Sequence, residues 1–212
     1  LGHSLLAALA ALALSGCGVL GGNSYHFRMT VEVDTPHGVK TGSSVYSVKA
    51  GKRIALMSEE AERYMEIRGE AAVVDLPGGP VFLLLKTPKD GQDVAFGKMS
   101  MRALDPVYED DRVESAGRIS GSWTTRTGEV PRAHWPIMVR FSDLKDPTSV
   151  EQVDPASIGV KRILLETTSD DVTTGIVERL GWLSNEGLTL NPNGKPTITP
   201  PFSGTIYQRD FS

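Results

Sequence analysis

Cys17 is the one cysteine in this chain of 212 residues, and small residues surround it. Leu14, Ser15 and Gly16 come directly before it, and Gly18 follows. A secreted domain that depended on disulfides would need further cysteines to pair with this one. The core must therefore be held by burial alone, and the thiol is left for chemistry other than a disulfide within the chain.

The apolar run before this cysteine is too short to cross a membrane. It covers residues 5–14 and reads LLAALAALAL. A membrane-spanning helix needs about 20 apolar residues. The hydrophobic region of a signal peptide needs only about 7 to 15, followed by small residues at the cleavage site. We therefore expect residues 1–16 to be a signal peptide that is removed from the mature protein.

The tetrad Leu14-Ser15-Gly16-Cys17 resembles the lipobox of bacterial lipoproteins. In that family the cysteine thiol is diacylated, the chain is cut before it, and the new amino group is acylated. Two or more acyl chains hold a protein firmly at a membrane, whereas one alone binds only marginally. The resemblance implies a location in the bacterial cell envelope, with the membrane as a partner through lipid on Cys17. Gly18 stands where an Asp favours inner-membrane retention in some lipoproteins, so the outer membrane facing the periplasm is favoured.

The chain after the cleavage site divides into a short tether and one domain. Residues 17–24 are rich in glycine, which predicts a flexible tether. Residues 25–212 are enough for a single globular domain with its own core. Prolines gather within residues 191–201, so we expect this segment to be irregular or extended.

Composition narrows the classes of partner. Hydrophobic residues make up 40% of the chain and charged residues 23%, which is typical of globular proteins. The formal net charge is −4, and we find no basic run. Binding to nucleic acid depends on neutralising phosphates, so we expect no nucleic-acid partner.

Residues 25–34 carry the clearest strand pattern. Five apolar side chains alternate with polar ones, which puts one face on a core and the other in water. The apolar positions are Tyr25, Phe27, Met29, Val31 and Val33. Residues 35–38 (TPHG) predict a turn, and residues 39–48 predict the returning strand of a hairpin.

Shorter patterns complete the expected fold. The sequence predicts an α+β domain, mainly an antiparallel sheet of six to eight short strands with two or three short helices. The expected helices cover residues 58–67, 94–104 and 175–183. The remaining expected strands cover residues 70–76 and 81–86 as a second hairpin, then 118–126, 137–141, 160–167 and 205–208.

Several short motifs lack the chain order or the spacing that their usual chemistry requires. Ser142-Asp143-Leu144-Lys145 matches S-x-x-K and residues 40–42 match K-T-G, but their order is the reverse of that in penicillin-recognising serine enzymes. The acidic cluster Glu109-Asp110-Asp111, with Asp105 nearby, lacks the alternating spacing of a calcium loop. We therefore expect no metal and no cofactor, and we assign no catalytic residue.

Two functions from different classes remain open. The first is a non-catalytic module that binds an envelope protein or another envelope ligand. The second is an envelope hydrolase whose site is assembled from distant segments, with His134 and Asp143 or Ser142 as candidates. His26 and His37 lie on the polar face of a strand and in a turn, without a partner that would orient them as bases. We favour the binding module.

Four segments of the chain resemble a set of proteobacterial proteins for which no activity is known, and they follow one another in the same order in those proteins. The resemblance implies no catalytic residues. The segments are residues 25–45 (YHFRMTVEVDTPHGVKTGSSV), 69–85 (GEAAVVDLPGGPVFLLL), 138–155 (MVRFSDLKDPTSVEQVDP) and 161–183 (KRILLETTSDDVTTGIVERLGWL).

Overall fold

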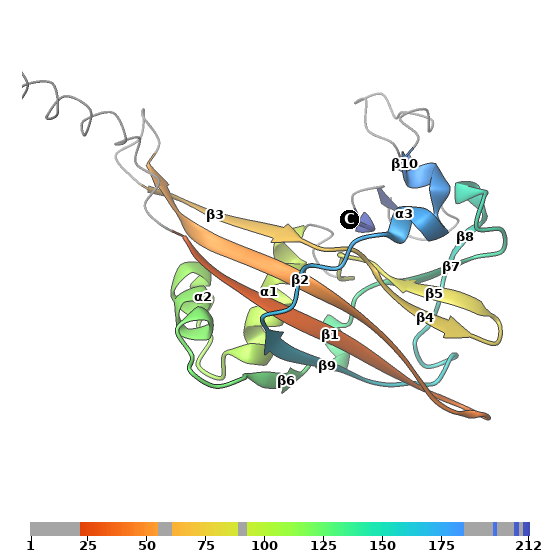
Figure 1. The fold of residues 1–212 in the computed structure, drawn as a ribbon, viewed down its shortest axis with the longest axis horizontal. Coiled ribbons are helices and arrows are strands. Elements are labelled where there is room, and N and C mark those ends of the chain that lie inside the picture. Colours follow the sequence, from red (N-terminus) through yellow and green to blue (C-terminus); the bar gives the residue numbers. More distant parts are fainter. Residues whose placement is uncertain (1–21, 55–60, 89–92, 185–196, 199–205, 208–209) are drawn as a thin grey trace, which may run out of the picture.

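The computed structural model describes residues 22–54, 61–88, 93–184, 197–198, 206–207 and 210–212 (Figure 1). The expected signal peptide, the tetrad of residues 14–17 and most of the proline-rich segment lie outside the described residues. Within the described part of the chain, no helix is long and apolar enough to cross a membrane.

A five-stranded antiparallel sheet is built on the hairpin that the alternation of residues predicted. Strand β1 (Asn23–Thr35) pairs with β2 (Gly38–Ile54) across a tight turn, where Gly38 has a φ of +103°. The strand order is β3-β2-β1-β9-β6, with β3 at Ala61–Arg68, β9 at Val160–Thr168 and β6 at Thr127–Glu129.

The buried face of β1 is the predicted one. Phe27, Met29 and Val31 are fully buried, and the alternate residues on the strand are only half-buried. The Phe27 ring stacks on Tyr46 of β2 at a centroid distance of 5.2 Å, and Tyr46 meets Phe96 edge-on at 5.0 Å. Such offset and edge-on contacts add to the stabilisation from burial alone.

A second antiparallel sheet has the order β4-β5-β7-β8. Its strands are β4 (Ala72–Leu76), β5 (Gly79–Leu83), β7 (Met138–Phe141) and β8 (Val150–Gln152). The two sheets meet where β4 crosses β2. A Cβ at Gly42 of β2 would lie 2.1 Å from the Val73 carbonyl oxygen, so this crossing requires glycine.

Two helices pack on the first sheet, toward the end away from the second sheet (Figure 1). Helix α1 covers Asp93–Leu104 and α2 covers Arg112–Ser120. Asp111 caps α2, because its carboxylate accepts hydrogen bonds from the N–H groups of Val113 and Glu114. The shorter elements are α3 (Ile176–Arg179), three 3₁₀ turns (Arg132–His134, Pro147–Ser149 and Gly181–Ser184) and the pair β10 (Thr197–Ile198) and β11 (Ile206–Tyr207).

The predicted α+β class with a mainly antiparallel sheet is confirmed. In the described part of the chain, the two larger sheets together hold nine strands, and three α-helices accompany them. Both predicted hairpins are present. The helix expected at residues 94–104 and the strands expected at 137–141 and 160–167 are also present.

Two predicted elements are wrong. Residues 61–67 of the expected helix 58–67 form strand β3, because β2 runs on to Ile54 and offers them an edge to pair with. Met65 and Ile67 then both approach α1 at Gly97, as alternate residues of a strand do. Residues 118–126, expected as a weak strand, instead contain the last turn of α2 and a loop.

Candidate functional site

An open hollow of about 490 Å³ lies where β1 begins and β9 ends. The end of α2 and the loop at residues 121–126 form its other walls. Its lining comes from three separate stretches of the chain: Ser24, Tyr25 and His26; Ile119, Ser120, Ser122, Trp123, Thr124 and Thr125; and Thr167, Thr168 and Ser169.

The lining of this hollow is polar but almost uncharged. Nine of its twelve residues carry a hydroxyl group, and none is Asp, Glu, Lys or Arg. The one imidazole of the lining is that of His26, whose Nδ1 lies 2.8 Å from the Asp170 carbonyl oxygen. The hollow can therefore exchange hydrogen bonds with a ligand, and its lining offers no Asp, Glu, Lys or Arg for an ionic contact.

Trp123 differs from the other two tryptophans of the chain. Its side chain is fully exposed, with a relative accessibility of 101%. Trp135 and Trp182 are buried, and their indole N–H groups donate to the carbonyl oxygens of Val130 and Leu144. A tryptophan normally buries its large ring in a core or an interface, so a fully exposed one beside a hollow makes this surface a candidate contact site.

Local hydrogen bonds shape the loop that presents Trp123. The Ser122 hydroxyl donates to the Thr124 carbonyl oxygen at 2.9 Å and accepts from the Thr124 N–H at 3.4 Å. Serine side chains that bond the backbone two residues away favour such turns over regular strands. This is the physical reason why the predicted strand at 118–126 does not form.

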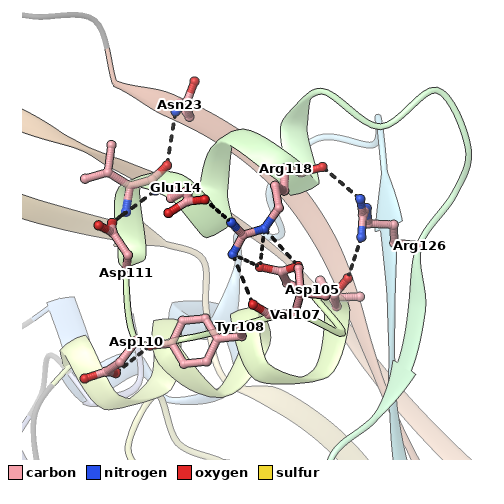
Figure 2. A network of polar contacts seen from close by, with 11 residues as sticks. Asn23, Asp105, Val107, Tyr108, Asp110, Asp111, Glu114, Arg118 and Arg126 are labelled. Atoms are coloured by element: carbon pink, nitrogen blue, oxygen red, sulfur yellow. Dashed lines mark hydrogen bonds and ion pairs between the residues drawn. The ribbon is translucent and has the colours of Figure 1, made fainter.

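Arg126 fixes the far end of the same loop to three elements, and Figure 2 shows its contacts with two of them, the end of α1 and α2. Its guanidinium donates to the Leu104 carbonyl oxygen at the end of α1 and to the Arg118 carbonyl oxygen in α2. Its backbone N–H donates to Thr167 Oγ1 on β9 at 2.9 Å. The walls of the hollow are therefore tied to one another beneath the Trp123 loop.

A buried ion pair holds α2 against the end of α1. The Asp105 carboxylate has no exposed area, and it accepts from Arg118 Nε at 3.0 Å and from Arg118 Nη2 at 2.7 Å (Figure 2). Burial raises the pKa of Asp105. The hydrogen bonds and the positive charge of Arg118 lower that pKa, and the net result is a pKa below the ordinary value.

Asp105→Asn should lower the free energy of unfolding at pH 7 by about 2–3 kcal/mol, since hydrogen bonds to a charged partner are lost. A carboxyl whose pKa is lowered by folding stabilises the fold above its ordinary pKa of 3.8, and this stabilisation is lost as the pH falls through the folded value. The variant should therefore lose less stability than the parent below about pH 4. Urea unfolding between neutral and acid pH measures both effects.

Glu109→Gln serves as the control, because Glu109 is an exposed carboxylate of the same loop. An acid loss of stability equal in the Asp105→Asn variant and the parent would contradict the role given to the ion pair.

The other members of the acidic cluster have separate structural partners. Asp110 accepts from the Tyr108 hydroxyl at 2.8 Å and lies 3.2 Å from Lys98 Nζ. Asp111 caps α2 and pairs with Arg63 at 3.1 Å. Across the described ranges, no group of three or more His, Cys, Asp or Glu side chains is arranged to hold a metal ion.

The residues named for a hydrolase lie at opposite ends of β7. His134 ends the 3₁₀ turn before this strand, and Ser142 and Asp143 belong to the turn that follows it. The Asp143 carboxylate accepts from the Lys145 N–H at 2.9 Å and so stabilises its own turn. The structure does not assemble these three residues around the hollow.

Comparisons with protein-family models, curated proteins and solved structures found no match to the chain. Both resemblances noted in the sequence, the lipobox and the proteobacterial segments, therefore stay predictions. Sequence reasoning assigned Trp123 no role and placed it in a strand. The signal that pointed to a loop was its setting between small hydroxyl residues, SGSWTT at 120–125.

Proposed function

We propose that this chain is a lipid-anchored lipoprotein of the bacterial cell envelope, facing the periplasm from the outer membrane. In this proposal it is a non-catalytic module that binds its ligand in the hollow beside Trp123. The single observation that supports it most is where the hollow lies: Ser24, at the start of β1, is one of its lining residues.

The tether would keep this hollow near the membrane. Six residues separate Ser24 from Cys17, and the chain from Cys17 to Ser24 reaches at most about 25 Å when fully extended. Asn23 fixes the start of the domain, because its side-chain amide donates to the Val113 carbonyl oxygen of α2 at 3.2 Å. A ligand in the hollow would therefore be held within a short distance of the anchored cysteine.

The chemistry of the hollow favours binding over hydrolysis. A hydrolase that works through a general base needs a side chain oriented by a partner and aimed at the substrate. Here the lining holds one imidazole, that of His26, with no Asp, Glu, Cys or Lys beside it in the lining, and the other groups are hydroxyl, aromatic and aliphatic. Such groups position a ligand through shape and hydrogen bonds.

Cys17→Ser should abolish acylation and block normal processing of the precursor, because the sulfur of the Cys17 thiol is the atom that would carry the lipid. Metabolic labelling of cells with a palmitate analogue measures the first effect, and the mass of the mature chain measures the second. Ser24→Ala, which leaves the cysteine intact, is the matched control and should be labelled like the parent. Equal labelling of the Cys17→Ser chain would show that lipid is attached elsewhere and would overturn the anchor.

A further inference from the structure

We infer that the hollow beside Trp123 binds a neutral saccharide, with the indole ring as the surface on which a sugar ring stacks. This inference rests on the binding role proposed above for the same hollow, but it does not require the lipid anchor. It names the chemical class of the ligand from three observations: the charge of the lining, the state of its hydroxyl groups and the exposure of the tryptophan.

The charge of the lining argues against an ionic ligand. Recognition of phosphate or carboxylate relies on Arg or Lys, and an ammonium ligand would need a carboxylate. The lining has none of these. The guanidinium closest to His26 along β1 belongs to Arg28, and it is already paired with Glu166 and Asp170. A charged ligand would lose its hydration here without gaining an oppositely charged partner. The lining therefore favours a neutral ligand.

Two hydroxyl oxygens of β9 already accept a hydrogen bond from the backbone. Thr167 Oγ1 accepts from the Arg126 N–H at 2.9 Å, and Thr168 Oγ1 accepts from the Asp170 N–H at 3.1 Å. Each oxygen is thus held in place as an acceptor while its own hydrogen can point toward a ligand. Sugar hydroxyls both donate and accept, so they match a wall of fixed hydroxyls better than an apolar ligand does.

The exposed indole supplies the apolar part of such a site. A pyranose ring has a face of C–H groups as well as a rim of hydroxyls, and an aromatic ring can cover that face. Trp123 projects from a loop whose ends are fixed by Ser122 and Arg126, so the ring is presented at a defined place. The hollow thus offers an aromatic ring for the apolar face of a sugar and hydroxyl groups for its polar rim.

A membrane surface fits the same tryptophan less well. Trp is favoured at membrane interfaces, but docking there also relies on apolar neighbours or on basic residues that attract anionic lipids. Ile119 is the one aliphatic side chain of the lining, and no Lys or Arg belongs to it. The hydroxyl-rich surroundings of Trp123 therefore favour the saccharide.

The test uses the full chain purified in mild detergent and titrated with cellotetraose, maltotetraose, N-acetylated chitotetraose and a β-1,4-galactotetraose. Trp135 and Trp182 are buried, so iodide quenching of fluorescence reports on Trp123. We expect at least one sugar to shift the emission to shorter wavelength and to protect Trp123 from iodide, in a saturable manner. In the second arm, the Cys17→Ser chain, which carries no lipid, is mixed with phosphatidylcholine vesicles in the absence of sugar and detergent.

Variants test whether the sugar binds in the hollow. Their affinities are measured by isothermal titration calorimetry, which does not depend on tryptophan fluorescence. Trp123→Ala should weaken binding about tenfold or more, a difference of about 1.4 kcal/mol. Trp123→Phe should recover part of the affinity, because it restores an aromatic face. Val39→Ala removes another exposed apolar side chain, on the hairpin, and should bind like the parent.

Either of two results would overturn the saccharide. One is the absence of any response to all four sugars at about 10 mM, which would occupy most of a site of millimolar affinity. The other is a fluorescence shift when the chain without lipid is mixed with vesicles alone, which would assign Trp123 to a membrane. Sugar binding without palmitate labelling would overturn the anchor only, and labelling without sugar binding would overturn this inference only.

Discussion

Replacing Phe27 with alanine should lower the free energy of unfolding by about 3–5 kcal/mol, a large part of the stability of one domain. Phe27 is completely buried on β1, between the sheet and the helices. Its ring stacks on Tyr46 and lies 6.4 Å from Phe96 of α1, so its removal leaves a cavity among large side chains that cannot close it.

Thr30→Ala is the matched control, because Thr30 lies on the opposite face of the same strand and is only half-buried. Its cost should stay within about 0.5 kcal/mol, as for most substitutions away from the core. Equilibrium unfolding in urea, followed by circular dichroism, compares the two variants. If Thr30→Ala proved more damaging than Phe27→Ala, the strand would face the other way, since a shift of one residue exchanges the two faces.

The alternation in β1 could be read from the sequence because one of its faces is buried and the other is solvated. That condition produces a strict period of two, and a turn with Gly38 follows it directly. β4 and β5 were found for a related reason, since their apolar runs flank a proline–glycine turn. Local signals were sufficient for these two hairpins, where a tight turn joins two runs of apolar residues.

Strand β3 could not be predicted in this way. Residues 61–68 (AERYMEIR) contain good helix formers. The charged residues near both ends of this segment are compatible with a helix as well as with an edge strand. Their conformation depends on the length of β2, whose last residues pair with them. Pairing in the folded protein therefore overrides local propensity, and the sequence around β3 contains no signal of it.

The candidate site was hidden for a different reason. Its lining comes from β1, the region after α2 and the end of β9, which the fold brings together across more than a hundred positions of the chain. Ser and Thr side chains have no spacing that marks a binding site, unlike metal ligands or catalytic motifs. Trp123 was visible as a residue, but its exposure depends on the turn that Ser122 makes.

The second large loss of stability is expected from a substitution near residue 212, at Phe211. Phe211 lies near the end of the sequence, after a proline-rich segment that predicted irregular structure, yet it is fully buried. Its ring centroid lies 5.6 Å from that of Trp182, 6.1 Å from Phe141 and 6.3 Å from Phe82. These rings belong to the second sheet and to the 3₁₀ turn beside it, so Phe211 completes a cluster built by distant segments.

Backbone contacts hold this segment in place. The Phe211 carbonyl oxygen accepts from the Ala71 N–H at 2.9 Å, and the Asp210 carbonyl oxygen accepts from the Leu85 N–H at 2.8 Å. The Asp210 carboxylate also lies 3.6 Å from Lys86 Nζ, in an almost completely buried pair. The end of the chain thus joins the strands around Ala71 and Leu85, and its register is fixed on both sides of the ring.

Phe211→Ala should therefore lower the free energy of unfolding by about 3–5 kcal/mol, because the cavity it leaves is lined by three aromatic rings. It should also shift the emission of Trp182 to longer wavelength, since water can then reach the indole. Ser212→Ala, at an exposed position next to it, should cost no more than about 0.5 kcal/mol. Urea unfolding with tryptophan fluorescence reads both effects in one experiment. If the Phe211→Ala protein unfolded at the same urea concentration as the Ser212→Ala protein, with unchanged emission, the end of the chain would not be part of the core.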